Sequence, residues 1–132
     1  MITDKPIRVE NFLAAGSDPD HGAVVVFAGV VRADEKDGRR VTRIHYDCYE
    51  EMARRELSEL VDKVREESGV SEIRAVHRVG DVPAGDVSLL VVVTAGHRAE
   101  AYEANRRVVE EIKRRVPIWK KEIYDDKSAR WL

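Results

Sequence analysis

The sequence contains a single cysteine, few aromatic residues and no long apolar run. Cys48 has no internal partner, so the fold cannot depend on an internal disulfide. The longest apolar stretch, residues 23–31, is far shorter than the roughly 20 residues that cross a bilayer as a helix. The N-terminus shows no charged head followed by an apolar run and a cleavage site. We therefore expect a cytoplasmic protein without a membrane span.

Several kinds of functional site are also missing. The four histidines show no metal-ligand spacing and no cysteine cluster accompanies them, which argues against a metal site. No serine elbow indicates a hydrolase, and no glycine-rich run with Lys and Ser or Thr indicates a phosphate loop. Cys48 falls on the apolar side of its predicted strand, where a buried thiol is more common than a nucleophile.

The charge distribution is uneven although the net charge is only -2. The near-neutral total argues against a surface that tracks nucleic acid as a whole. Between His97 and Lys121, however, eight Arg or Lys residues face four Glu, so this stretch carries a net charge of +4 and the remainder -6. A local basic zone in an acidic protein indicates a small anionic ligand or an acidic partner.

Hydrophobic patterns predict four strands. Residues 23–31 are continuously apolar and β-branched, as in a strand covered on both faces. Residues 42–49 and 73–79 alternate between apolar and polar, and Val87–Ala95 is a second continuous apolar strand. Because residues 80–86 have turn chemistry, the strands on either side of them are expected to pair antiparallel.

Two amphipathic helices are predicted. In Glu50–Ser68 the apolar residues keep helical spacing, and Gly69 suits the C-terminal cap. The second helix spans residues 99–115. It must end near residue 116 because Pro117 disfavours helical geometry in the residue before it.

The N-terminal residues 1–22 carry the weakest patterns. A short strand at residues 7–9, a short helix near Phe12 and a loop around residues 17–20 are the expectations there.

Two further segments are expected to be irregular. Residues 32–40 are polar, contain Gly38 and are predicted to form a mobile loop, and residues 118–132 are predicted to form a short, charged, partly extended tail. The length of 132 residues suits one hydrophobic core. We therefore predict one α+β domain over residues 1–132, with a mostly antiparallel sheet.

Cations of the second helix form a stripe beside its apolar face. Helical spacing places five residues on this stripe: Arg98, Tyr102, Arg106, Val109 and Lys113. Lys120 follows beyond the Pro117 break, and a break of this kind can bring it toward Lys113.

Two converging lysines could hold an anion and transfer protons, because clustered cations lower one another's affinity for a proton. The alternative is that these cations only complement the C-terminal dipole of the helix, as cations at helix ends often do. From spacing alone the second interpretation is the more common one.

Ends of two apolar strands supply further candidates. Arg32 ends the first apolar strand, and Gly96, His97 and Arg98 follow the second. Loops at strand ends often carry binding residues, and Gly29 and Gly96 remove side chains where a ligand could approach. A turn or packing role for these glycines is equally compatible with the sequence.

Five segments in one collinear order carry a family resemblance over residues 23–131. They are residues 22–32, Tyr46 with residues 51–53, residues 77–80 with 85–86, residues 95–98, and residues 113–122 with their Pro-x-Trp-Lys ending. Together they resemble the large, catalytic subunit of molybdopterin synthase. Residues 33–40 are more acidic than the family pattern, Gly96 stands where Ser or Ala is usual, and little chain follows Trp131.

The resemblance implies an α/β-hammerhead fold and a homodimer. A small ubiquitin-like sulfur carrier would dock on each large subunit, giving a heterotetramer, and its C-terminal Gly-Gly thiocarboxylate would enter a basic pocket. Sulfur would pass to cyclic pyranopterin monophosphate and form the dithiolene of molybdopterin. The resemblance implies no metal or other cofactor for this step, and no nucleic acid or membrane partner.

It also implies roles for individual residues. The family's essential lysines correspond to Lys113 and Lys120, which we predict to be catalytic. The predicted substrate-binding residues are the matches to the family's anion contacts and pocket wall, together with two further cations. They are Phe27, Arg32, His97, Arg98, Lys121 and Arg130.

Two other interpretations stay open at this stage. The chain could be a non-catalytic anion-binding or regulatory homodimeric module of the same fold, or a structural homodimer whose basic helix binds an acidic neighbour. Lys113 and Lys120 favour the enzyme, because a binding module could use Arg at either position without losing charge. Which lysine acts as base, and whether a dimer shares its pocket, are also open.

Overall fold

The computed structural model describes residues 1–13 and 19–132. Their elements, in chain order, are β1 (Ile2–Thr3), the 3₁₀ helix η1 (Val9–Phe12), β2 (Ala23–Val30), β3 (Glu35–Lys36), β4 (Arg39–Cys48), α1 (Glu50–Ser68), β5 (Glu72–Arg78), β6 (Gly80–Pro83), β7 (Val87–Ala95), α2 (Arg98–Arg115), β8 (Ile118–Tyr124) and β9 (Ala129–Trp131).

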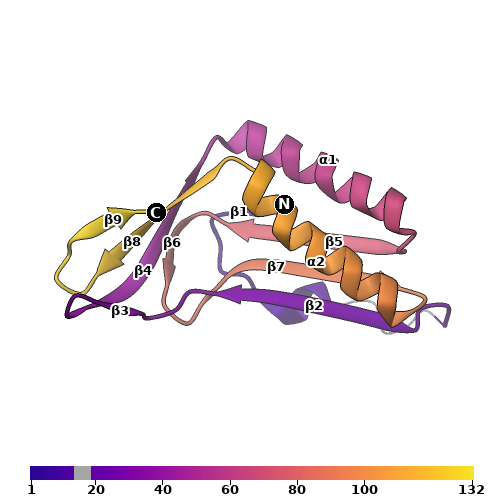
Figure 1. Ribbon diagram of the computed structural model, residues 1–132, viewed down its shortest axis with the longest axis horizontal. Coiled ribbons are helices and arrows are strands. Elements are labelled where there is room, and N and C mark those ends of the chain that lie inside the picture. Colours follow the sequence, from indigo (N-terminus) through magenta and orange to yellow (C-terminus); the bar gives the residue numbers. More distant parts are fainter. Residues whose placement is uncertain (14–18) are drawn as a thin grey trace.

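The first sheet has the strand order β1-β5-β7-β2, and all of its pairs except β1 with β5 are antiparallel. The β5–β7 pairing confirms the antiparallel pair expected around residues 80–86. Helices α1 and α2 lie side by side over one face of this sheet (Figure 1). The arrangement confirms the α+β class with a mostly antiparallel sheet and two main helices.

The second sheet lies beyond one end of the first (Figure 1). Its order is β3-β4-β8-β9, and β6 pairs with residues 43–46 of β4 on the edge opposite β8. The last turn of α2 points toward this sheet, whereas its first turn lies at the far end of the molecule (Figure 1). The second sheet therefore meets only one end of the helical layer.

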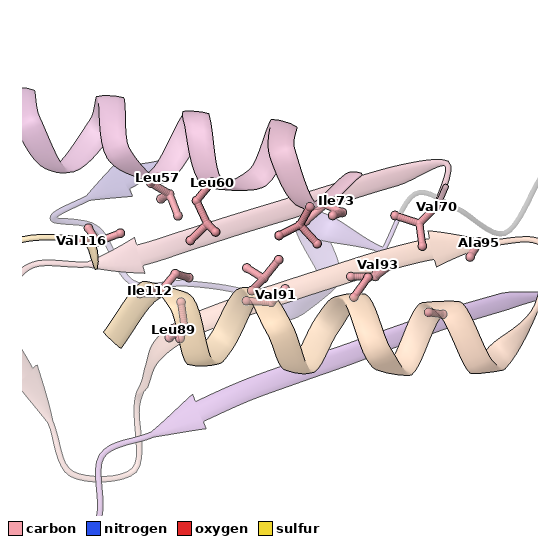
Figure 2. Packing of buried hydrophobic residues seen from close by; sticks show 14 of the residues in the cluster. Leu57, Leu60, Val70, Ile73, Leu89, Val91, Val93, Ala95, Ile112 and Val116 are labelled. Atoms are coloured by element: carbon pink, nitrogen blue, oxygen red, sulfur yellow. The ribbon is translucent and has the colours of Figure 1, made fainter. Parts of the chain in front are cut away.

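The main core lies between the helices and the first sheet (Figure 2). Leu57 and Leu60 of α1 and Val108 of α2 are almost fully buried there, and they meet Val91 and Val93 of β7. Aliphatic side chains fill this space, as the low aromatic content requires. Burial of this kind contributes about 1.5–3 kcal/mol for each large aliphatic side chain, so the core fixes where the helix ends lie.

The helix limits follow from their capping residues. Helix α1 ends before Gly69, which is left-handed with φ 72° and donates its N–H to the Arg65 carbonyl, as predicted. Helix α2 ends at Arg115, and Val116 is extended because Pro117 follows it. Both predicted helices are confirmed, with α2 starting one residue earlier than expected.

Strand β2 corrects one prediction. Its inner face packs on the core, but Val24, Val26 and Val30 on the outer face are 42%, 39% and 50% exposed. The expectation of a strand covered on both faces is wrong for the single chain, since these outer-face side chains are open to solvent.

The N-terminal predictions are mixed. The strand expected at residues 7–9 is wrong, since the strand is β1 at residues 2–3, while the short helix near Phe12 is confirmed as η1. Of the loop expected around residues 17–20, residues 17 and 18 lie outside the described residues, and residues 19–20 form a turn.

Three polar segments contain more regular structure than predicted. The expected loop at residues 32–40 holds β3 and the start of β4, and the turn at residues 80–86 holds β6. The expected tail at residues 118–132 forms β8 and β9, and β8 is a central strand of the second sheet. These strands were missed because their pairing depends on backbone hydrogen bonds to neighbouring strands more than on an apolar face.

Candidate active site

A cavity of about 550 Å³ opens where the last turn of α2 meets both sheets. Its apolar wall comes from the core side of the first sheet and from α2, and its polar wall comes from the second sheet and the segment after β2. The lining includes Phe27, Arg32, Asp34, Lys36, Tyr46, His77, Ser88, Lys113, Lys120 and Glu122.

The cavity brings Lys113 and Lys120 together. Lys113 belongs to the last turn of α2, and only Val116 and Pro117 separate that helix from β8. Because Val116 has φ -82° and ψ 123°, the chain turns directly from helix to strand, and Lys120 returns toward the helix end. The predicted convergence of the two lysines is confirmed.

Phe27 and Arg32 reach the same cavity from β2 and the residues after it. Phe27 lies on the inner face of β2, opposite Val91 of β7, and is 36% exposed. The Arg32 side chain is 83% exposed and its Nη2 lies 3.3 Å from Oδ2 of Asp34. Arg32 is therefore a solvent-accessible cation at the cavity, free to exchange its exposed partner for an anionic ligand.

An ion pair anchors the polar wall. Nζ of Lys36 donates to Oε1 of Glu122 at 2.7 Å, and the Tyr124 hydroxyl donates to the same oxygen at 3.0 Å. Burial raises the pKa of Glu122, but these hydrogen bonds and the charges of Lys36 and Arg130 outweigh it and hold the pKa below its usual range. Glu122 is thus an ionised, structurally engaged carboxylate.

His97 and Arg98 do not line this cavity. They begin α2 and line a second depression with Gly22, Gly96 and Ala99. The His97 backbone N–H donates to Oε1 of Glu100 at 2.9 Å, so the residue caps the helix. From Arg98 to Lys113 the helix rises roughly 22 Å, at about 1.5 Å per residue. The expectation that all these cations meet around one guest is wrong within a single chain.

Lys121 and Arg130 do not line the cavity either. Successive residues of a strand face opposite ways, so Lys121 points away from the face that carries Lys120. Its Nζ lies 4.9 Å from the centre of the Trp131 ring, a cation–π contact. Arg130 stands opposite Glu122 in β9 and is exposed.

Several polar lining residues were not among the candidates from the sequence, including Lys36, Tyr46, His77 and Ser88. Tyr46 and His77 did fall within the resembling segments, and His77 sat on an alternating strand among apolar neighbours, which is the signal that could have found it. Lys36 and Ser88 gave no comparable signal.

The cavity suits an anionic guest. Lys113 and Lys120 bring two ammonium groups, and Arg32 adds a guanidinium that can bind a phosphate or carboxylate in two places. The two lining carboxylates already face cations of their own, Asp34 with Arg32 and Glu122 with Lys36. Positive charge therefore prevails around the guest.

Other site types find little support in the part of the chain that the structure describes. It contains no group of three His, Cys, Asp or Glu side chains placed to hold a metal ion. Among those same residues, no helix is both long and apolar enough to span a membrane.

Comparison with known proteins gives the family. The profile of the MoaE protein family matches residues 2–115, most of the chain. The chain belongs to the MoaE family. Membership makes the chain an enzyme subunit of molybdopterin biosynthesis and confirms the resemblance to the molybdopterin synthase catalytic subunit.

Similar proteins with this fold and function cover nearly the whole chain. The molybdopterin synthase catalytic subunit of Thermoplasma volcanium is 37% identical over 98% of this chain and 94% of its own length. Catalytic subunit 1 of Mycobacterium tuberculosis is 37% identical over 99% of this chain and 88% of its own. The identity spans both sheets and both helices of this MoaE family member.

Solved structures agree with the fold. The crystal structure of molybdopterin synthase from Staphylococcus aureus superposes with a TM-score of 0.90 at 37% identity, covering 99% of this chain and 94% of the other. A complex of subunits 1 and 2 of the molybdopterin-converting factor from Helicobacter pylori superposes with a TM-score of 0.78 at 25% identity, covering 98% and 87%. This MoaE family member thus has the architecture of a two-component synthase subunit.

Proposed function

We propose that this chain transfers sulfur from the C-terminal thiocarboxylate of a small ubiquitin-like carrier to cyclic pyranopterin monophosphate, forming the dithiolene of molybdopterin. The observation that carries the proposal is the convergence of Lys113 and Lys120 in one cavity with Arg32. Membership of the MoaE family supports a role in molybdopterin biosynthesis, and the Helicobacter pylori complex is a precedent for two subunits.

The residues divide the work by their chemistry. Lys113 and Lys120 orient the thiocarboxylate, whose sulfur attacks substrate carbon and displaces an oxygen leaving group that takes up a proton. Water then cleaves the acyl–sulfur bond, so the sulfur stays on the substrate and the carrier leaves with a C-terminal carboxylate. The lysines move the protons, because an ammonium can donate a proton and an amine can accept one. Arg32 holds an anionic group of the substrate. Phe27 forms an apolar wall against which the pterin can pack. The proposed step uses no metal or other cofactor.

A homodimer would bring His97 and Arg98 to the site. Ala23 at the start of β2 lies opposite Ala95, next to His97, whereas the other end of β2 leads to Arg32 and the cavity. If two copies pair their β2 edges about a two-fold axis, the start of one β2 meets the end of the other. The partner's His97 would then lie near Arg32.

Reconstitution tests the proposal directly. The protein is mixed with a thiocarboxylated carrier and cyclic pyranopterin monophosphate, and dithiolene is measured. We expect Lys113→Ala and Lys120→Ala each to reduce the rate on the order of a hundredfold or more, because each removes a proton-transfer group and a charge. Lys120→Arg should restore anion binding but not the rate, since Arg stays protonated.

Lys63→Ala, on the exposed side of α1, serves as the control and should retain full activity. Binding of the carrier and the pterin without any dithiolene, in a folded wild-type sample, would contradict the proposal and favour a non-catalytic anion-binding module of the same fold.

A further inference from the structure

His77 lies at the floor of the cavity and has no part in the proposed mechanism so far. It belongs to β5, stands opposite Leu89 of β7, and shares the helix-facing side of the sheet with the apolar wall. The residue is only 7% exposed, yet it is among those that line the cavity. A buried polar side chain beside a cavity lined by cations needs a chemical explanation.

Its hydrogen bonds fix the orientation of the imidazole. Nδ1 lies 2.7 Å from the backbone oxygen of Arg78, and a carbonyl oxygen only accepts, so Nδ1 carries the proton and donates. Nε2 therefore keeps its lone pair. Within residues 1–13 and 19–132, no hydrogen bond occupies Nε2. The ring thus offers an uncommitted acceptor beside the cavity.

Lys120 is placed to meet this acceptor. It lies directly opposite Tyr46 in the β4–β8 pairing, so the two side chains share one face of the second sheet. The Tyr46 ring meets the His77 ring edge to face, with centroids 5.0 Å apart. His77 and Lys120 therefore flank the same aromatic side chain, and both line the cavity.

The side-chain carboxylates of the cavity wall are already engaged. Asp34 faces Arg32, and Glu122 accepts hydrogen bonds from Lys36 and Tyr124. A lysine ammonium that turns into the cavity needs a partner when its water is displaced by a substrate. The free imidazole nitrogen can supply one.

We propose that His77 is a positioning residue for Lys120: its Nε2 accepts a hydrogen bond from the Lys120 ammonium and holds Nζ toward the reacting atoms. The contact forms when substrate closes the cavity to water. The Lys120 ammonium keeps its remaining N–H groups for the thiocarboxylate or phosphate. The catalytic consequence rests on the proposed sulfur transfer, whereas the contact itself does not.

The surroundings keep the imidazole neutral and therefore an acceptor. Burial lowers the pKa of His77, the hydrogen bond to Arg78 opposes this, and the Lys120 charge lowers the pKa further. Of the neighbouring charges, the Met1 ammonium is bound to the Ala75 carbonyl, and the Arg78 guanidinium pairs with Asp86 at 3.0 Å. No carboxylate is among the causes of the His77 pKa shift, so no negative charge favours a protonated ring.

Two substitutions with amide side chains distinguish the roles of the two ring nitrogens of His77. His77→Asn keeps a donor near the Nδ1 position for the Arg78 carbonyl but removes the Nε2 acceptor, whereas His77→Gln places an amide oxygen near Nε2. We expect His77→Asn to remain folded and to lose about tenfold to a hundredfold in kcat with KM nearly unchanged. His77→Gln should recover part of that loss. Unchanged kcat in a folded His77→Asn protein would overturn the proposal.

Competitive amine labelling with acetic anhydride, read by mass spectrometry at pH 8 with saturating carrier bound and no pterin added, tests the contact without turnover. Loss of the acceptor leaves the ammonium less stabilised, so Lys120 of His77→Asn should label about three- to tenfold faster than Lys120 of the wild type. Lys63 in the same molecule is the internal reference. His45→Asn, a matched change at a histidine bound to Asp81, should leave Lys120 labelling unchanged.

A measurement without substitution at His77 guards against misfolding. Nitrogen NMR of the imidazole in wild-type protein should report an unprotonated Nε2 at neutral pH, and saturating carrier should shift its resonance toward the hydrogen-bonded range. Lys120→Ala should abolish that shift. A carrier-induced shift that persists in Lys120→Ala would overturn the proposal, whereas absent dithiolene with intact labelling and NMR effects would count only against the sulfur-transfer function.

Discussion

Gly22 lies where two backbone segments come very close together, at the end of the molecule that carries the first turn of α2. A Cβ atom at this position would lie 2.4 Å from the Gly96 carbonyl oxygen, and the Gly22 N–H donates to the Ala95 carbonyl at 3.1 Å. The approach ties the start of β2 to the end of β7, next to the depression lined by His97. Only glycine fits without moving one of the two segments.

We therefore expect Gly22→Ala to destabilise the fold by about 1–3 kcal/mol, because backbone atoms on both sides must shift. Urea unfolding followed by circular dichroism measures the change. Gly96→Ala is the matched control, since its nearest atom would be Glu100 Oε1 at 3.9 Å, and it should be close to neutral. Equal losses in both variants would refute the steric explanation.

Individual residues of the site were predictable to different degrees. The proline after a helix of predicted register allowed Lys113 and Lys120 to converge, which is local information, whereas their choice as catalytic residues came from the family resemblance. The separation of Arg98 from Lys113 was also implicit in helix length, but the family resemblance grouped them in one set. His77 required the three-dimensional contact with Tyr46, which connects strands of both sheets.

At the scale of elements, Asn105 holds the edge strand β2 in place. Its buried side-chain amide on α2 donates to the carbonyls of Val25 and Val91, both at 3.0 Å. One side chain thus bridges the helix to two strands. Loss of the donors would leave two buried carbonyls without these hydrogen bonds.

Asn105→Ala should cost about 2–3 kcal/mol in unfolding free energy, because two hydrogen bonds and their packing are lost. Hydrogen exchange should speed up most at the amides of β2. Glu103→Ala, on the exposed side of the same helix, should leave both measurements nearly unchanged. Uniform acceleration over the whole first sheet would show that the amide stabilises the fold without a specific hold on β2.

The β3–β4 hairpin is fixed to β8 by the contact of Lys36 with Glu122, and this contact predicts a pH dependence. The folded-state pKa of Glu122 is lowered, so its stabilising contribution is complete above the unfolded value near about 4.3 and is lost as pH falls through the lower folded value.

Lys36→Met removes one cause of the lowered Glu122 pKa and should destabilise the protein more at pH 7 than at pH 3. Urea midpoints at both values measure the difference between variant and wild type. Lys5→Met, at an exposed N-terminal position, is the control and should show no such pH dependence. A constant difference across this range would mean that Glu122 does not titrate as described.

Elements with strong periodicity were predicted well, and those without it were not. Helix α1 matched its predicted limits because its apolar residues recur on one face and glycine stops it. Strands β3, β6, β8 and β9 were not predicted, because their sequences contain exposed or charged side chains such as Lys121 and show little alternation between apolar and polar residues. Their order comes from partner strands that are distant in sequence, which local patterns do not report.

For the whole molecule, the exposed outer face of β2 predicts self-association. Val26→Lys should shift the protein from dimer to monomer in sedimentation experiments, because Val26 lies near the middle of β2, where two paired copies would place like charges close together. Glu59→Lys on α1, an exposed charge change away from β2, should leave the dimer intact. A monomeric wild-type protein at micromolar concentration would refute this arrangement.

A shared site also predicts complementation. Lys113→Ala and His97→Ala proteins, each inactive in reconstitution, should regain about a quarter of wild-type activity when unfolded and refolded together, since half of the dimers are then hybrids with one intact site. The same treatment of either variant alone is the control. Continued inactivity of the refolded mixture would mean that the two residues do not serve one site across the dimer.

Sequence patterns gave the fold class but could not give the assembly. The run at residues 23–31 is apolar whether its outer face is covered by the same chain or by another, so composition does not distinguish the two cases. The structure shows that the described residues of the same chain leave Val24, Val26 and Val30 partly exposed.

The short connection at Val116 and Pro117 has a consequence for protein engineering. It sets the spacing of the two lysines with no spare length, so a chain opened or extended there would separate the helix that carries one from the strand that carries the other. New termini belong instead in the exposed β8–β9 turn at residues 125–127, where a circular permutant can keep both lysines on an unbroken stretch of polypeptide.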